Sequence, residues 1–298
     1  MNLRFRLTWQ LHVLLIPAVV LVFIFSYIPM VGIVLAFQEF MLGRGFFGSP
    51  WVGLDNFVYL FTLPNMMQVI FNTVFLSLLK IICILSFSLL MALLLNEVQA
   101  GWFRKICQPV FLFPFFLSWV MLGGMFIDLF SMSSGFSQLI FRILNIDPIF
   151  FLGDGRWFRV ILVVTNTWKD MGYNMVIFLA ALTAIDPALY EAATIDGASR
   201  LQKVRHITLP GITPIITLLG ILAIGGILNA GFDQVFIMYN RLVYDAADII
   251  DTYVYRLGFV DAQYSLATAA GFFKSIVGFF LLIISYRLAS KYAGYRLF

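Results

Sequence analysis

The polar side chains whose spacing is most suggestive of chemistry lie in a segment that is otherwise apolar. The stretch TNTWKDMGYN places Asn166, Asp170 and Asn174 four residues apart, so they share one face of a helix (the polar stripe). Tyr173 flanks this face, and Trp168 is expected to point elsewhere. A row of amides and a carboxylate inside an apolar helix can line a water-filled pathway.

Four ionisable residues fall within long apolar segments, namely Lys80, Lys169, Asp170 and Lys274. Charged groups are costly at membrane depth, and they therefore rank as candidates for a functional site. The alternative is that Asp170 pairs with Lys274 or Lys80 and only holds helices together. The sequence leaves both interpretations open.

The sequence contains no recognisable arrangement of catalytic or metal-binding residues. His12 and His206 are too few and too far apart for a metal cluster. The stretch GFFKS at Gly271 lacks the glycine that a phosphate-binding loop requires before its lysine. We interpret Gly271 with Ser275, and Gly226 with Ala230, as small-residue pairs that pack helices. The sequence thus predicts no catalytic residues, no metal site and no cofactor in this chain.

The composition indicates an integral membrane protein. Of the 298 residues, 62% are hydrophobic and only 11% are charged, and the mean hydropathy is +0.97. Soluble domains are about 45–50% apolar and about 25% charged. The long continuous apolar runs indicate helices, because the strands of a membrane barrel would alternate. Cys83 and Cys107 lie in apolar stretches and are expected to be packing residues.

Six segments reach the roughly 20 apolar residues that a membrane-spanning helix needs. We predict an all-α polytopic membrane protein with one transmembrane domain over residues 1–298. The six predicted spans are 12–37, 67–95, 107–130, 159–182, 212–236 and 265–289. Longer connections at 38–66, 131–158 and 237–264 are predicted to lie on one side as loops.

The distribution of lysine and arginine predicts the orientation, because cytoplasmic loops carry an excess of both. One side would hold ten basic residues and the other six. The ten are Arg4, Arg6, Arg104, Lys105, Arg200, Lys203, Arg205, Arg287, Lys291 and Arg296, and the six are Arg44, Arg142, Arg156, Arg159, Arg241 and Arg256. Both termini and the connection between spans four and five are therefore predicted to be cytoplasmic.

That connection, residues 186–210 (the elbow), is unlike the rest of the chain. Asp186-Pro187 is a helix-start signal, with a side-chain acceptor followed by proline at the first helical position. Gly197 permits a bend, a second helical piece is expected from Ala198 to about His206, and Leu209-Pro210 leads back into the membrane. Small side chains around the bend would let another surface approach closely. The alternative is an amphipathic helix lying on the lipid surface.

The spacing in the elbow resembles the signature loop of ATP-binding-cassette importer permeases. The matching residues are Glu191-Ala192-Ala193, Asp196-Gly197-Ala198, Ile207 and Leu209-Pro210. Val204 departs from the pattern, because carbohydrate-uptake permeases often have an aromatic residue there. The stretches FSYIPMVGIVLAFQEF, GSPWVGLDNF and FDQVFIMYN are similar to the carbohydrate-uptake (maltose-type) branch, and within it to Gram-positive permeases for oligosaccharides and polysaccharide fragments.

This resemblance implies a permease that works by alternating access in the plasma membrane of a Gram-positive bacterium. The elbow would be a coupling helix seated in a cytoplasmic ATPase, present in two copies, which would carry the ATP and magnesium. A second homologous permease and an extracellular solute-binding protein would complete the importer, with no nucleic-acid partner. The implied coupling residues are Glu191, Ala192, Ala193, Asp196, Gly197, Ala198, Arg200, Leu209 and Pro210.

For an oligosaccharide substrate, the candidate pathway residues carry aromatic rings, amides and charges. They are Trp168, Lys169, Asp170, Tyr173, Asn174, Asn229, Asp233 and Lys274. Other solutes of the same superfamily remain open, such as a polyamine, a phosphodiester or an amino acid. A stand-alone channel or secondary transporter would need inverted repeats or paired broken helices, which the sequence does not display.

Overall fold

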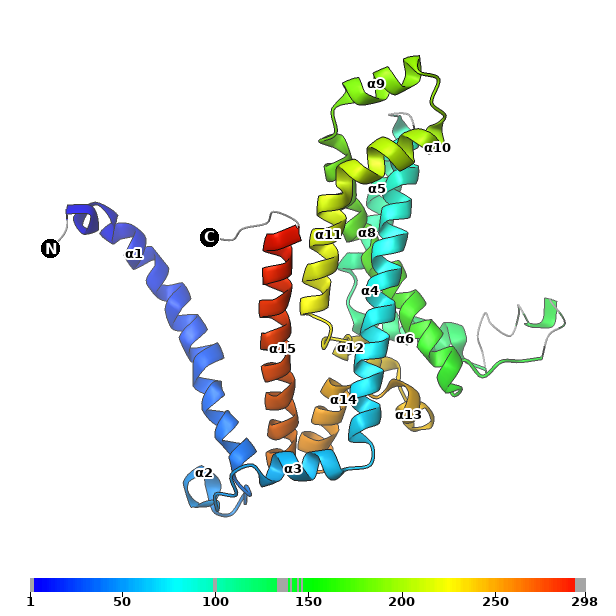
Figure 1. Cartoon of the computed structure of the whole chain (residues 1–298). Coiled ribbons are helices and arrows are strands. Elements are labelled where there is room, and N and C mark those ends of the chain that lie inside the picture. Colours follow the sequence, from blue (N-terminus) through cyan, green and yellow to red (C-terminus); the bar gives the residue numbers. More distant parts are fainter. Residues whose placement is uncertain are drawn as a thin grey trace. The chain divides into compact units, whose positions relative to one another are not determined.

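The computed structural model describes residues 3–98, 101–132 and 147–292, together with 139, 141–143 and 145. All regular elements in these ranges are helices, and one isolated antiparallel bridge joins Gln38 to Trp51 (Figure 1). The predicted all-α class is confirmed. By its internal contacts the chain divides into two units, which are described separately below.

The first unit comprises Met1–Leu63 and Val254–Phe273. Its helices are α1 (Leu3–Val22), η1 (Phe23–Tyr27), η2 (Ile28–Phe37), α2 (Gly45–Gly48), α3 (Asp55–Thr62), η6 (Arg256–Val260) and the beginning of α15 (Tyr264–Tyr292). Phe37 joins these parts, because its ring stacks on Trp51 at 5.7 Å and meets the edge of Phe272 at 5.8 Å. The most apolar part of Leu11–Phe37 has no buried residue, so it presents a continuous apolar surface to lipid or to other protein surfaces.

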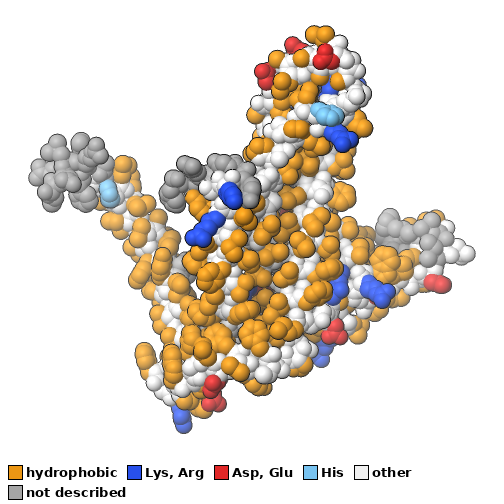
Figure 2. All heavy atoms as spheres, in the orientation of Figure 1, with side chains coloured by type: hydrophobic (Ala, Val, Ile, Leu, Met, Phe, Trp, Pro, Cys, Tyr) orange, Lys and Arg blue, Asp and Glu red, His pale blue; other side chains and the backbone are white. Residues whose placement is uncertain are grey.

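The second unit comprises Pro64–Tyr253 and Lys274–Phe298. Its helices are α4 (Met66–Glu97), α5 (Trp102–Leu112), η3 (Phe113–Phe116), α6 (Trp119–Phe130), α8 (Gly155–Thr183), α9 (Pro187–Ile195), α10 (Arg200–Lys203), η4 (Val204–Thr208), α11 (Leu209–Gly225), α12 (Phe232–Met238), η5 (Arg241–Val243), α13 (Tyr244–Ala247), the first turn of α14 (Ile250–Tyr255) and the end of α15. Hydrophobic side chains cover its helices, and charged side chains gather on the elbow (Figure 2).

The α4–α8 pair forms the centre of the second unit. One apolar cluster includes Leu76 of α4, Phe158 of α8 and Val235 of α12. A second cluster nearer the elbow includes Ala92 of α4 and Phe178 of α8. The two long helices therefore form the frame on which the shorter, broken helices are held.

Four helices are long and apolar enough to cross a membrane, and two bent pairs bring the number to six. The four are Leu11–Phe37, Met66–Glu97, Arg200–Gly225 and Tyr264–Lys291. The pairs are Trp102–Phe116 with Trp119–Phe130, bent by 98°, and Gly155–Thr183 with Pro187–Ile195, bent by 69°. The predicted number of spans fits this architecture, and the predicted orientation of the termini stays a prediction.

Two predicted spans are not continuous helices, so the prediction of six uninterrupted apolar segments is wrong for both of them. Segment 107–130 turns after Pro114, where Ser118 caps the new helix by accepting a hydrogen bond from the Met121 amide. Segment 212–236 is interrupted between Gly225 and Phe232. Gly226 and Ala230 lie in this interruption, so their predicted role as a helix-packing pair is also wrong.

The ends of the predicted loops also differ. The elbow's second helical piece does not stop before Leu209-Pro210 but continues into α11, through a wide π-helical turn over Val204–Thr208. Such a turn fits a proline because it relaxes the regular hydrogen-bond ladder where the proline lacks its N–H. Much of the predicted loop 237–264 is helical, as η5, α13, α14 and η6.

Candidate functional site

The polar stripe of α8 forms as predicted. The Asn166 Nδ2 amide donates to Asp170 Oδ2 at 2.6 Å, and the Asn174 amide reaches the Asp170 carbonyl oxygen at 3.4 Å. These three side chains are only partly buried within the chain. Trp168 points to another neighbour, since its ring meets the edge of Phe126 of α6 at 5.8 Å. The stripe therefore keeps polar atoms accessible on one helix face.

Two aromatic contacts attach the stripe to the break between η3 and α6. Lys169 Nζ donates to the Phe115 carbonyl oxygen at 2.8 Å and lies 5.2 Å from the Phe115 ring centroid. The Tyr173 ring stacks on the same Phe115 ring, with 4.7 Å between the ring centroids, and remains about half exposed. Lys169, Tyr173 and Phe115 thus form one polar-aromatic surface next to Asp170.

The ion pairs expected from the packing alternative are wrong. Lys274 Nζ pairs with Asp251 Oδ1 at 2.6 Å, whereas Asp170 has its sequence neighbour Lys169 at 3.7 Å. Lys80 donates to the Ala230 carbonyl oxygen and to Gln234 instead. The carboxylate of Asp170 therefore does not join α8 to another helix through either of the expected lysines.

The other predicted pathway residues lie in or beside the interruption of the fifth span. Asn229 lies in the interruption, two residues before Gly231, and Asp233 is in the first turn of α12. Asn229 and Asp233 are both exposed. Lys274 is mostly buried against Asp251 near the start of α15. That these residues contact the solute stays a prediction.

The elbow contains well-formed caps at both of its helices. Asp186 Oδ1 accepts from the Ala188 amide at 2.9 Å and begins α9. Gly197, with a φ of +74°, ends it in a Schellman motif, in which the Ala198 amide reaches the Ala193 carbonyl oxygen at 2.9 Å. Ser199 and Gln202 then form a capping box at α10. The helix–bend–helix prediction is confirmed.

Further hydrogen bonds hold the two elbow helices in a fixed arrangement. Lys203 Nζ donates to Thr194 Oγ1 at 2.8 Å, and the Tyr190 and Thr208 hydroxyls are 3.0 Å apart. Between the helices lies a hollow of about 310 Å³ (the notch). Its lining residues are Ala193, Asp196, Gly197, Ala198, Gln202, Lys203, His206 and Ile207.

The structure brings four of the predicted coupling residues into the notch: Ala193, Asp196, Gly197 and Ala198. The others lie around it. Glu191 and Ala192 are exposed on α9, Leu209 and Pro210 begin α11, and Arg200 faces Glu97 at 4.0 Å. Sequence reasoning did not assign Gln202 to this surface, although the spacing Ser199-x-x-Gln202 is a readable capping box.

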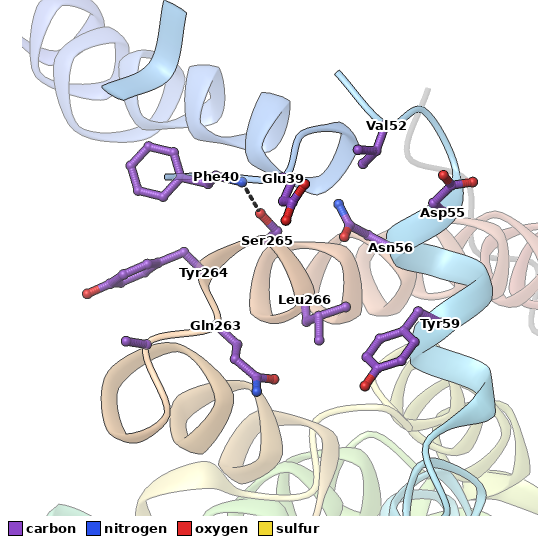
Figure 3. Close-up of a pocket in the computed structure, with 11 residues that line it drawn as sticks. Glu39, Phe40, Val52, Asp55, Asn56, Tyr59, Gln263, Tyr264, Ser265 and Leu266 are labelled. Carbon is purple, nitrogen blue, oxygen red and sulfur yellow. Dashed lines mark hydrogen bonds between the residues drawn. The ribbon is translucent and has the colours of Figure 1, made fainter. Parts of the chain in front are cut away.

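The first unit contains a second polar hollow, of about 490 Å³ (Figure 3). It is formed by the segment after η2, by α3 and by the start of α15, where the Phe40 amide donates to Ser265 Oγ at 2.9 Å. Glu39 and Asp55 contribute carboxylates, and no lysine or arginine is among its described lining residues. This chemistry suits a cationic or hydroxyl-rich group rather than an anion.

Comparison with known proteins assigns the family. Residues 84–294 match the family described as "Binding-protein-dependent transport system inner membrane component". The chain belongs to this family. The matched residues include the polar stripe, the elbow and the interrupted fifth span of the permease.

Named relatives agree with this assignment over 74% to 95% of the chain. The permease is 39% identical over 282 residues to the "Polygalacturonan/rhamnogalacturonan transport system permease protein YteP" of Bacillus subtilis (strain 168), covering 95% of this chain and 88% of the relative. It is 31% identical over 222 residues to the lactose transport system permease protein LacF of Rhizobium radiobacter, covering 74% and 72%.

A solved structure resembles the permease over nearly the full length of both chains. The crystal structure of a bacterial ABC transporter involved in the import of the acidic polysaccharide alginate matches with a TM-score of 0.89 and 35% identity, covering 97% of this chain and 98% of that one. The same transporter type has been solved in complex with an alginate pentasaccharide-bound periplasmic protein, with a TM-score of 0.88.

Proposed function

We propose that this chain is the permease subunit of an ATP-driven importer for oligosaccharides or polysaccharide fragments, working by alternating access. The observation that supports it most is the match over nearly the whole chain to relatives named for polysaccharide transport. The polar stripe supports the same proposal, because amides, a carboxylate and the exposed Tyr173 ring are groups that bind sugar hydroxyls and C–H faces.

The importer is proposed to contain a second homologous permease, two copies of a cytoplasmic ATPase and an extracellular solute-binding protein, in the plasma membrane of a Gram-positive bacterium. ATP and magnesium would bind to the ATPase, and this chain would catalyse no reaction. The unburied apolar surface of Leu11–Phe37 supports a partner or lipid contact there. The complex of the similar alginate transporter with a periplasmic protein supports the solute-binding partner.

The elbow is proposed to seat in the ATPase and to transmit its movement to the spans. The Gly197 turn and the Lys203–Thr194 hydrogen bond fix α9 and α10 to each other. A displacement of the notch by the ATPase would therefore move both helices together. α10 continues through η4 into α11 as one apolar helix of 26 residues. A displacement of the elbow would therefore pass directly into the fifth span.

The substrate class can be tested with the assembled importer. We would purify the chain with the second permease, the ATPase and the binding protein encoded beside it, and reconstitute them in vesicles. ATP hydrolysis and uptake would be measured with a panel of neutral oligosaccharides, uronic-acid oligosaccharides, polyamines, phosphodiesters and amino acids. Stimulation by an oligosaccharide supports the proposal. Stimulation only by one of the other solutes, or flux through this chain alone without ATP, contradicts it.

Replacing Asp170 with alanine is expected to lower oligosaccharide uptake about tenfold, since a hydrogen bond to a charged group contributes about 1.5–3 kcal/mol. The change removes the acceptor of Asn166 and leaves Lys169 without its neighbouring carboxylate. Uptake and basal ATP hydrolysis would be measured in the same vesicles, and hydrolysis should stay low without solute.

The matched control for this change is Asp147→Ala, which removes an exposed carboxylate outside the spans. It should transport at the rate of the unmodified importer. Tyr173→Ala provides a second variant of the same surface. If Asp170→Ala and Tyr173→Ala both transport normally, the stripe only packs helices.

A further inference from the structure

The predicted fifth span, residues 212–236, is not one continuous helix. α11 ends at Gly225, α12 begins at Phe232, and residues 226–231 between them are not in regular helix. Gly231 has a φ of +88°, a left-handed conformation that glycine adopts without steric cost. A carbonyl group that such a break frees in a buried segment must find a donor within the protein, and Ala230 is 1% exposed.

Lys80 of α4 supplies a donor to this break. Its side chain is 4% exposed, and its Nζ donates to the Ala230 carbonyl oxygen at 2.6 Å. The same atom donates to Gln234 Oε1 at 2.5 Å. A Cβ atom on Gly231 would lie 3.3 Å from this Nζ, so the ammonium group lies directly beside the left-handed residue. Lys80 therefore binds a carbonyl group within the interruption and a side chain of the helix that follows it.

Gln234 extends the connection to a third helix. It is fully buried in the first turns of α12, and its Nε2 donates to the Leu162 carbonyl oxygen and to Thr165 Oγ1 of α8, both at 2.8 Å. Its oxygen accepts from Lys80, so both ends of the amide have partners. The Lys80–Gln234 tie thus joins α4, α8 and the interrupted span through two side chains.

This arrangement decides which way the neighbouring residues face. Ala230 and Gln234 are held against α4 and α8, and both are buried. Asn229 and Asp233, each the preceding residue in the chain, are exposed instead. A regular helix through residues 226–231 would change the rotation of Asn229 relative to α12. The tie therefore determines how these two polar groups are presented.

We propose that Lys80 and Gln234 are positioning residues that hold the fifth span open and present Asn229 and Asp233 to the solute pathway. Lys80 itself would not contact the solute, because its Nζ is buried and already bound to two acceptors. The geometric part of the proposal depends on the contacts alone, whereas the assignment to the pathway rests on the proposed function.

Thiol labelling tests the geometric part without ATP, solute or partners. In a background with Cys83→Ser and Cys107→Ser, the reporter Asn229→Cys would be labelled with a water-soluble maleimide in membrane vesicles. Lys80→Met keeps the unbranched stem but removes the donors, so the Ala230 carbonyl loses its partner. We expect the labelling rate to fall at least about fivefold as the break closes. Ile195→Cys, on exposed α9, should label at an unchanged rate.

Two further variants keep the test decisive. Gln234→Leu should reduce labelling in the same way, and adding it to Lys80→Met should cause little extra change, because both remove one connected network. If Lys80→Met does not insert, Gln234→Leu alone decides. Unchanged labelling of Asn229→Cys in an inserted variant overturns the proposal, whatever the transported solute proves to be.

In the reconstituted importer, Lys80→Met should raise the KM for the solute about tenfold with a smaller change in kcat, because presentation of Asn229 and Asp233 is altered and the elbow is not. A packing defect alone would instead lower the amount of folded importer and leave KM unchanged. An unchanged KM together with altered labelling would overturn the assignment to the pathway but not the tie.

Discussion

Replacing Ala193 with arginine is expected to abolish solute uptake while the chain still folds and inserts. Ala193 lies in the notch, on the inner side of the helix-bend-helix that is proposed to seat in the ATPase. An arginine there would fill the hollow and add a bulky charged group beside Lys203 to a contact between proteins. An uncompensated buried charge costs about 3–5 kcal/mol, which corresponds to more than about a 100-fold weaker complex.

The measurement is ATP-dependent uptake in vesicles, together with co-purification of the ATPase. Ala188→Arg is the matched control, because it adds the same side chain to the same helix at a position outside the notch. It should keep most of the activity. If Ala193→Arg binds the ATPase and transports at the normal rate, the elbow is not the coupling element and lies elsewhere, for example on the lipid surface.

Gly197→Asp is expected to give the same loss through a second cause. Gly197 has a φ of +74°, which strains an L-residue by about 1–2 kcal/mol. The added carboxylate would also stand at the opening of the notch beside Asp196. Gly197→Ala separates the two effects, since it adds the strain without the charge and should retain partial uptake.

Replacing Gly172 with alanine is expected to have the largest effect on folding. A Cβ atom at this position of α8 would come closer than 3.0 Å to the Phe111 carbonyl group and the Leu112 Cα of α5. These are backbone atoms, which cannot move aside as a side-chain end can. Overpacking typically costs about 1–3 kcal/mol, and contact with backbone places Gly172→Ala at the upper end of that range.

The control for this prediction changes the same residue type in an open helical position. Gly220 of α11 has no atom within 4 Å of its added Cβ. Alanine favours a helix interior over glycine by about 0.5–1 kcal/mol, so Gly220→Ala should leave stability unchanged or raise it. Folded protein remaining after heating in detergent would be measured by size-exclusion chromatography. Equal stability of the two variants would contradict the close α5–α8 approach.

The elbow could be predicted closely because its structure is determined by neighbours in the sequence. Asp186 caps the helix that starts at Pro187, and Gly197 ends it, through interactions within a few residues. The face shared by Asn166, Asp170 and Asn174 follows in the same way from the helical repeat. The number of spans likewise depends on the length of apolar runs, which is a local property.

The interruptions and the ion-pair partners could not be predicted, because they depend on residues far apart in the chain. Lys80 and Ala230 are 150 residues apart, and their hydrogen bond satisfies a buried carbonyl group that the break in the fifth span leaves without a helical partner. The sequence offers several carboxylates as possible partners for Lys274, and only the fold shows that Asp251 lies beside it. Residues 212–236 are predicted to be one continuous helix only because their apolar run is long enough to span a membrane.

Sequence alone therefore determined the membrane class, the all-helical architecture, the elbow and the polar face of α8, since each follows from composition or from contacts within about two helical turns. Tertiary structure alone decided where the helices break, which groups satisfy the freed carbonyls and which lysine meets which carboxylate. The reason is that a buried polar group must be paired, and its partner is chosen by packing between helices that the linear order of residues does not reveal.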